Sequence, residues 1–141
     1  MGEGVHQTLG WLARAVGLFY LLGGVLTLRA GQVEAFLDSA LTLIDLRRPE
    51  GPERLRGWSM MAIGVLTAAS GLTLLLLSRW AVVAFLANAA LQAAYLAWAA
   101  RALPATDLAS TLGRRRTRNA FAVWLVMTGL VLALFELRVL T

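Results

Sequence analysis

Four long apolar stretches constrain this chain of 141 residues more than any other feature. A transmembrane helix needs roughly 20 mostly apolar residues to cross a hydrocarbon core of about 30 Å. The stretches are continuous and rich in Leu, Ala and Gly, without the period-two alternation of barrel strands. The sequence therefore predicts an all-α fold: a single transmembrane domain over residues 1–141, built as an integral membrane four-helix bundle. The expected spans are Leu9–Leu28, Trp58–Leu77, Trp80–Ala100 and Asn119–Leu137.

Composition supports a membrane protein and removes several kinds of chemistry. Hydrophobic residues make up 59% of the chain, against about 45–50% in ordinary globular proteins. The absence of cysteine excludes disulfides, thiolate metal sites and iron–sulfur clusters. The single histidine, His6, precedes the first span and cannot provide bis-histidine haem ligation within one chain. We therefore expect no enzymatic activity, no cofactor and no bound metal.

The basic residues are unevenly distributed, and this predicts the topology. All thirteen are arginine, and ten of them fall in the segments between the first two spans and between the last two. Because cytoplasmic loops of membrane proteins are enriched in basic residues, both segments are expected in the cytoplasm and both termini outside. The lipid bilayer, rather than nucleic acid, is then the expected partner of these charges. The ten are Arg29, Arg47, Arg48, Arg54, Arg56, Arg101, Arg114, Arg115, Arg116 and Arg118.

Tryptophan positions give an independent indication of the boundaries, because the amphipathic indole ring prefers the headgroup level. Trp11 and Trp80 fall at the predicted outer boundary. Trp58, Trp98 and, one turn deeper, Trp124 fall at the predicted inner one.

Small residues recur at helical spacing in the first two spans. Lipid offers helices no hydrophobic drive to associate, so helix contacts are enriched in small side chains that allow close backbone approach. Both stripes are therefore predicted to face other helices. They are Gly10, Ala13, Gly17, Tyr20, Gly24 and Thr27 in the first span, and Gly57, Met60, Gly64, Thr67, Ala68 and Gly71 in the second.

The third span carries the most polar intramembrane face of the chain. Asn88, Gln92 and Tyr95 lie one turn apart on one side of the predicted helix. Two interpretations remain open for these side chains. They form hydrogen bonds between helices, or they line a pocket for a quinone or another small hydrophobic molecule.

Two ionisable residues lie at membrane depth near the outer boundary, Arg14 and Glu136. Such residues are candidates for function by default. Glu136 shares a helical face with Ala122, Gly129 and Ala133, which predicts that it points into the bundle. Snorkelling of the side chains to the headgroups, a structural ion pair between them, and a ligand or proton role are the three alternatives.

An amphipathic segment follows the first span, at residues 32–46. Its apolar residues have spacings of three and four, which is typical of a helix with one buried face. Glu34, Asp38 and Asp45 cluster beside that face, whereas a helix lying on an anionic leaflet would carry basic residues there. We expect a short, separate cytoplasmic helix that docks on the cytoplasmic end of the bundle or on a partner. The apolar positions are Val33, Phe36, Leu37, Ala40, Leu41 and Ile44.

The order of these motifs resembles the DoxX-like family of small four-helix bacterial membrane proteins. Arg14-x-x-Gly17 followed by Tyr20-Leu-Leu-Gly-Gly24 is similar to the family's opening span, and Val33-Glu-Ala-Phe-Leu to its amphipathic segment. The stretch Gly64-Val-Leu-Thr-Ala-Ala-Ser-Gly71-Leu, running to Leu77-Ser-Arg79-Trp80, resembles its second span, arginine turn and third span. The resemblance implies an accessory subunit, since some members associate with oxidoreductases or quinone-linked systems.

These patterns lead to two hypotheses about function. The first is a non-catalytic accessory or structural subunit in a bacterial inner membrane, whose partner is another membrane protein or a second copy of the chain. The alternative is a redox or transport component that binds a quinone or hydrophobic ligand at Asn88, Gln92 and Tyr95, with Arg14 and Glu136 as polar gates.

Overall fold

The computed structural model describes residues 2–45, 51–103, 106 and 108–140, without the side chains of residues 34, 38, 41–42, 44–45, 53 and 109–110. The all-α prediction is confirmed over these residues. Each of the four helices includes a segment long and apolar enough to cross a membrane. This supports a membrane protein. The helices are α1 (Glu3–Asp45), α2 (Gly51–Leu75), α3 (Trp80–Ala102) and α4 (Leu108–Glu136).

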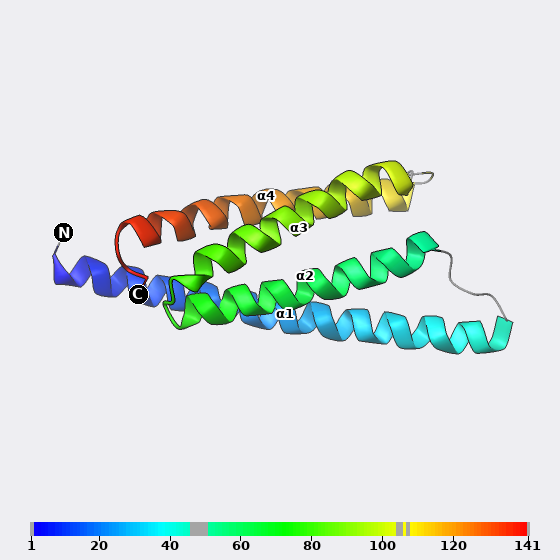
Figure 1. Ribbon diagram of the computed structural model, residues 1–141, viewed down its shortest axis with the longest axis horizontal. Helices are drawn as coiled ribbons and strands as arrows, with labels where there is room; N and C mark the ends of the chain where they lie inside the picture. The colour runs from blue at the N-terminus through cyan, green and yellow to red at the C-terminus, as the bar shows by residue number, and fades with distance from the viewer. Residues whose placement is uncertain (1, 46–50, 104–105, 107, 141) are drawn as a thin grey trace.

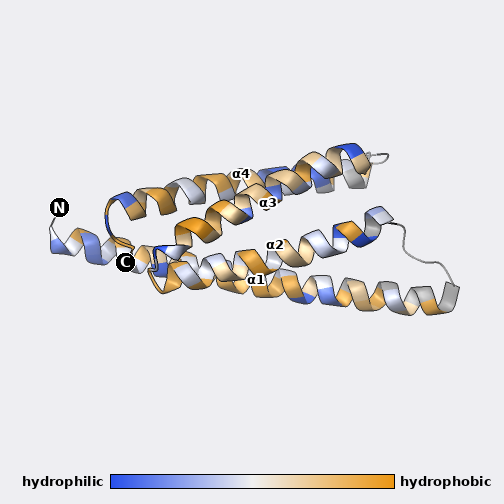
Figure 2. Cartoon of the chain, in the orientation of Figure 1, coloured by the Kyte–Doolittle hydropathy of each residue, from blue (hydrophilic) through white to orange (hydrophobic). Residues whose placement is uncertain are grey.

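The helices form two antiparallel hairpins, α1 with α2 and α3 with α4, joined by a short turn (Figure 1). The ends of α1 and α3 and the starts of α2 and α4 lie at one end of the molecule (Figure 1). The N-terminus, the α2–α3 turn and the C-terminal segment lie toward the other (Figure 1). We call these the connection end and the terminal end. The α2 and α3 ribbons diverge toward the connection end. Hydrophobic residues run along all four helices (Figure 2).

The amphipathic segment at 32–46 is not a separate helix, and that prediction is wrong. The first span continues without interruption into it, so that α1 is 43 residues long, or about 65 Å at 1.5 Å per residue. Gly31 alone is a weak breaker, and the first proline comes only at Pro49, so nothing stops the helix earlier. Phe36 and Leu43 are 74% and 84% exposed and do not dock on the bundle. The predicted acidic cluster of Glu34, Asp38 and Asp45 lies outside the described side chains.

The contact between α1 and α2 is made through glycine, as the small-residue stripes predicted. A Cβ atom on Gly17 would lie 2.8 Å from the carbonyl oxygen of Gly71, and one on Gly24 would collide with the backbone of Ala68. Gly64 packs mainly against the side chain of Leu28, with less crowding. Only glycine therefore permits this helix separation at positions 17, 24 and 71. Gly57 and Thr27 are exceptions to the prediction, because both are exposed, and an added Cβ on Gly57 has no neighbour within 4 Å.

Aromatic rings join the two hairpins at the centre of the bundle. Tyr20 of α1 meets Phe85 of α3 and Trp124 of α4 edge-on, at centroid distances of 5.6 and 4.8 Å, and Phe85 and Trp124 stack at 4.7 Å. Trp124 is 4% exposed, and its indole Nε1 donates to the carbonyl oxygen of Phe85 over 3.2 Å. The prediction of Trp124 as part of the inner aromatic belt is therefore wrong. A buried partner for its N–H makes the core position favourable.

Candidate functional site

The polar face of α3 forms a hydrogen bond to α2. Asn88 is fully buried, and its Nδ2 donates to Oγ1 of Thr67 over 2.9 Å. The Thr67 hydroxyl donates in turn to the carbonyl oxygen of Ile63, at 2.7 Å. Because the hydroxyl hydrogen is used there, the Thr67 oxygen can only accept from Asn88, which fixes the orientation of the amide. Of the two alternatives for this polar face, the interhelical hydrogen bond is thus confirmed for Asn88.

The other half of this amide has no partner. Oδ1 of Asn88 is buried and accepts no hydrogen bond from any described residue. Leaving a buried acceptor unpaired costs about 1–3 kcal/mol. A hydrogen-bond donor on a water molecule or a ligand would therefore be stabilised at this oxygen.

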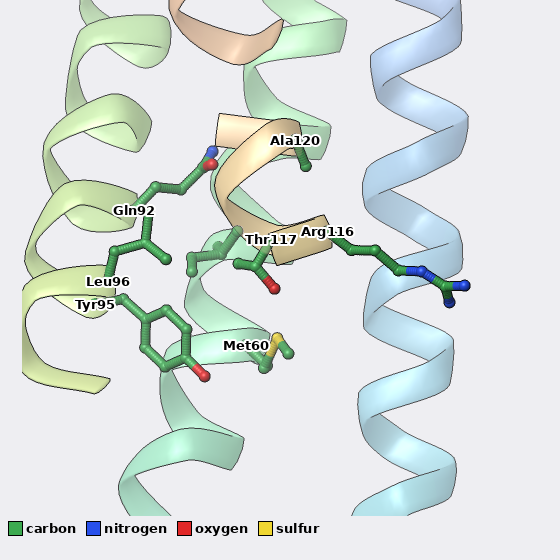
Figure 3. Close-up of a pocket in the computed structure, with 8 residues that line it drawn as sticks. Met60, Gln92, Tyr95, Leu96, Arg116, Thr117 and Ala120 are labelled. Carbon is green, nitrogen blue, oxygen red and sulfur yellow. The ribbon is translucent and has the colours of Figure 1, made fainter. Parts of the chain in front are cut away.

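One turn further along the same face, Gln92 and Tyr95 line a cavity of about 330 Å³ between α2, α3 and α4. Figure 3 shows Gln92, Leu96 and Tyr95 from α3 facing Met60 of α2 and the first half of α4. Asn88 does not line the cavity. The lining residues are Met60, Ile63, Gln92, Tyr95, Leu96, Arg116, Thr117 and Ala120.

The chemistry of this cavity is amphipathic. Within the part of the chain that the structure describes, the Gln92 amide and the Tyr95 hydroxyl have no hydrogen-bond partner, while Met60, Ile63 and Leu96 supply apolar wall. Small-molecule sites combine an apolar lining with a few such polar groups. Arg116 also lines the cavity, but in Figure 3 its side chain extends away from Gln92 and Tyr95.

The α4 contribution to this cavity was not predicted from the sequence. Thr117 belongs to no motif in the sequence. Arg116 lies in a run of basic residues that the positive-inside rule already explains. Only the rotation of α4 about its axis, which the sequence does not specify, places them there. A neighbour in the same run has a structural role, since the Arg114 guanidinium donates to the carbonyl oxygen of Leu103 just after α3. Arginine commonly satisfies free carbonyls at helix C-termini.

The structure does not bring Arg14 and Glu136 to this cavity. Both are exposed, and no ion pair joins them among the described residues. The Arg14 guanidinium lies 5.5 Å from the centroid of the Trp11 ring, a cation–π distance. The five predicted site residues therefore separate into Gln92 and Tyr95 at the cavity, Asn88 one turn away, and the two ionisable residues elsewhere.

The prediction that Glu136 points into the bundle is wrong, and so is the inward assignment of its face. Ala122, Gly129, Ala133 and Glu136 are all exposed, and an added Cβ on Gly129 meets nothing within 4 Å. The buried side of α4 is roughly opposite and carries Trp124, Thr128, Val131 and Leu134. Large side chains fill the space between α4 and α3 here. The small-residue stripe faces outward.

The described residues offer no metal centre, because no three His, Asp or Glu side chains among them gather closely enough to hold an ion. Comparison with family models, with curated proteins and with solved structures finds no match to this chain. Proposals about its function therefore rest on its own geometry.

Proposed function

We propose that this protein is a non-catalytic subunit of a membrane complex, and that it binds a transmembrane helix of its partner on the outward face of α4. The membrane we propose is a bacterial inner membrane, with the arginine-rich connection end in the cytoplasm and both termini outside, as the positive-inside rule favours. The DoxX-like resemblance would agree with such an accessory role.

The observation that carries this proposal is the small-residue face of α4. Ala122, Gly129 and Ala133 are small and exposed on the outward side of the helix, and an added Cβ on Gly129 would meet nothing within 4 Å. In lipid, small residues on a helix face allow another helix to approach closely and gain van der Waals contact. The chain uses the same device between α1 and α2, where glycines set the helix separation. The α4 stripe has no partner within the described chain, so a helix from another chain would fill it.

Glu136 adds a polar reason for a partner. It is exposed and is the last residue of α4, where the helix dipole disfavours an acidic side chain by about 0.3–1 kcal/mol. A cationic or hydrogen-bonding group on a docked helix would offset this cost. The small residues and the carboxylate lie on one face of α4, so a single helix can contact both.

The test is a pull-down of the tagged full-length protein from native membranes in gentle detergent, with mass spectrometry of what co-purifies. We expect one membrane protein in stoichiometric amount, and its loss when Gly129→Leu places a large side chain on the small-residue face of α4. Gly23→Leu is the matched control, because Gly23 is also a spanning glycine with nothing within 4 Å of an added Cβ. Its partner recovery should equal that of the wild type.

Two results would contradict the subunit proposal. One is partner recovery that Gly129→Leu leaves unchanged. The other is recovery of the protein alone or only as a dimer, which would assign the outward face of α4 to lipid or to a second copy of the chain.

A second function is favoured by a separate observation, the cavity lined by Gln92 and Tyr95. Its two unpaired polar groups and its apolar wall suit a hydrophobic molecule with a carbonyl or hydroxyl head, such as a quinone. We expect extraction of the purified protein to release such a molecule in this case. Gln92→Leu with Tyr95→Phe should abolish retention while leaving the partner complex intact, whereas equal retention would exclude the cavity as the site.

A further inference from the structure

A second cavity, of about 320 Å³, lies at the terminal end, where three distant segments meet. They are the first turns of α1, the turn after α2, and the segment that follows α4. Val139 and Leu140 in this last segment are buried, so the chain is held against the bundle after α4 ends. The cavity is lined by His6, Gln7, Gly10, Trp11, Arg14, Leu77, Arg138 and Val139.

The charge in this cavity runs against the distribution in the rest of the chain. Ten of the thirteen arginines fall within residues 29–56 or 101–118, and the other three, Arg14, Arg79 and Arg138, lie toward the terminal end. This cavity is lined by two of these three arginines, Arg14 and Arg138, and by His6, the only histidine of the chain. None of its eight lining residues is acidic. Gln7 adds a neutral amide donor. Such a set of donors without a carboxylate suits an anion.

Backbone conformation supplies an independent observation. Leu77 and Arg138 are the two non-glycine residues with positive φ in the described chain, at 53° and 55°, and both line this cavity. Each ends a helix in a Schellman motif: Ser78 N donates to the carbonyl of Thr73, and Val139 N to that of Leu134. Glycine is the ordinary residue at this position, because the left-handed conformation is unfavourable for other residues. A side chain retained at such a cost is expected where the side chain itself is used.

We propose that this cavity binds a phosphate group, held by the guanidinium groups of Arg14 and Arg138 with a ring N–H of His6. Arginine recognises phosphate through paired, charge-assisted hydrogen bonds. The phosphate belongs either to the headgroup of an anionic phospholipid or to a free phosphate ion.

The position of the cavity suits the lipid source. Trp11 lines it and is 64% exposed, and Trp80 at the same end is 62% exposed, as expected of rings at headgroup level. Leu77 and Val139 give the cavity apolar surface that the glycerol and first acyl carbons of a lipid would contact. A free phosphate ion has no apolar part to contact these two residues. The affinity for lipid relative to that for free phosphate therefore distinguishes the two sources.

The experiment uses the full-length protein, delipidated in a neutral maltoside detergent and titrated by thermophoresis with three probes: short-chain phosphatidylglycerol, short-chain phosphatidylcholine and inorganic phosphate. We expect phosphatidylglycerol to bind at least about 10-fold more tightly than phosphatidylcholine. Loss of one charge-assisted contact should weaken binding by about 10-fold or more, so Arg14→Gln and Arg138→Gln should each do so. Arg79→Gln, an exposed arginine at the same end outside the cavity, should change affinity less than about two-fold.

Arg138→Gly separates binding from folding. It removes the cation and also replaces a left-handed arginine by the residue that prefers this conformation. We expect a higher melting temperature together with lost phosphate binding, which a failure to fold would not produce. Inorganic phosphate binding as tightly as phosphatidylglycerol would assign the site to the free ion, and weaker binding to the lipid. Unchanged affinity in Arg14→Gln and Arg138→Gln, or an equal loss in Arg79→Gln, would overturn the proposal.

Discussion

Substitution of Gly71 by alanine should weaken the α1–α2 hairpin, although alanine is the better helix former. A Cβ on Gly71 would lie 2.6 Å from the Gly17 carbonyl oxygen and closer still to the backbone N of Leu21, whereas ordinary van der Waals contact begins near 3.4 Å. The helices would have to separate by about 0.8 Å at this point to relieve the first contact alone. The obstructing atoms are backbone, so no side-chain rotation can make room. Every neighbouring contact of the hairpin would loosen with the movement.

Overpacking of this kind costs about 1–3 kcal/mol, and alanine returns up to about 1 kcal/mol through helix propensity. We therefore expect Gly71→Ala to lower the free energy of unfolding by up to about 2 kcal/mol, and to be about 1–3 kcal/mol less stable than the same substitution at an uncrowded helical glycine. The same substitution at Gly129 is the matched control, because its Cβ meets nothing within 4 Å. Gly129→Ala should leave stability unchanged or raise it by up to about 1 kcal/mol.

The assay is reversible unfolding of the purified protein in mixed micelles of a mild detergent and SDS, followed by circular dichroism. A thermal melt of each variant gives a second measure. The reasoning would be refuted if Gly71→Ala were as stable as Gly129→Ala, since the backbone contact would then not set the helix separation.

Three further changes test the interior and the helix ends. Thr67→Val should lower the free energy of unfolding by about 1–3 kcal/mol, because it leaves the buried Asn88 amide hydrogens unpaired. Thr67→Ser should keep most of the wild-type stability. Equal stability of the valine and serine variants would contradict the hydrogen bond between Thr67 and Asn88. Trp124→Phe should cost about 1 kcal/mol or more through loss of the hydrogen bond to the Phe85 carbonyl, and a loss no larger than that at an exposed tryptophan would count against a core position. Arg138→Gly should raise stability by about 1 kcal/mol by relieving the left-handed conformation, and an unchanged thermal melt would show that the conformation carries no strain.

Much of the α1–α2 packing could be predicted from the sequence. Glycines at helical spacing in an apolar run have few explanations besides close helix approach, and Gly17, Gly24 and Gly71 make this contact. The interhelical bond of Asn88 was predictable for a similar reason, because a buried amide at membrane depth needs a partner.

The orientation of α4 was not predictable in this way. In lipid, both the inward and the outward sides of a helix are apolar, so periodicity identifies faces without saying which of them is buried. The Gly129 stripe was assigned inward on the strength of its small residues, whereas the inward side carries large ones such as Trp124. The role of Trp124 was missed for the same reason. Its position along the span suited a tryptophan at the headgroup level. No feature of the sequence indicated that Tyr20 and Phe85 would pack against it.

We propose that the four helices cross the membrane with the arginine-rich connection end on one side and the α2–α3 turn and both termini on the other. The chain has no cysteine, so single cysteines placed at Gly2, Arg54, Arg79 and Arg115 can be probed in intact bacterial cells with a membrane-impermeant maleimide. We expect positions 2 and 79 to react from outside, and positions 54 and 115 to react only after the membrane is permeabilised. Labelling of positions 54 and 79 from the same side would contradict it.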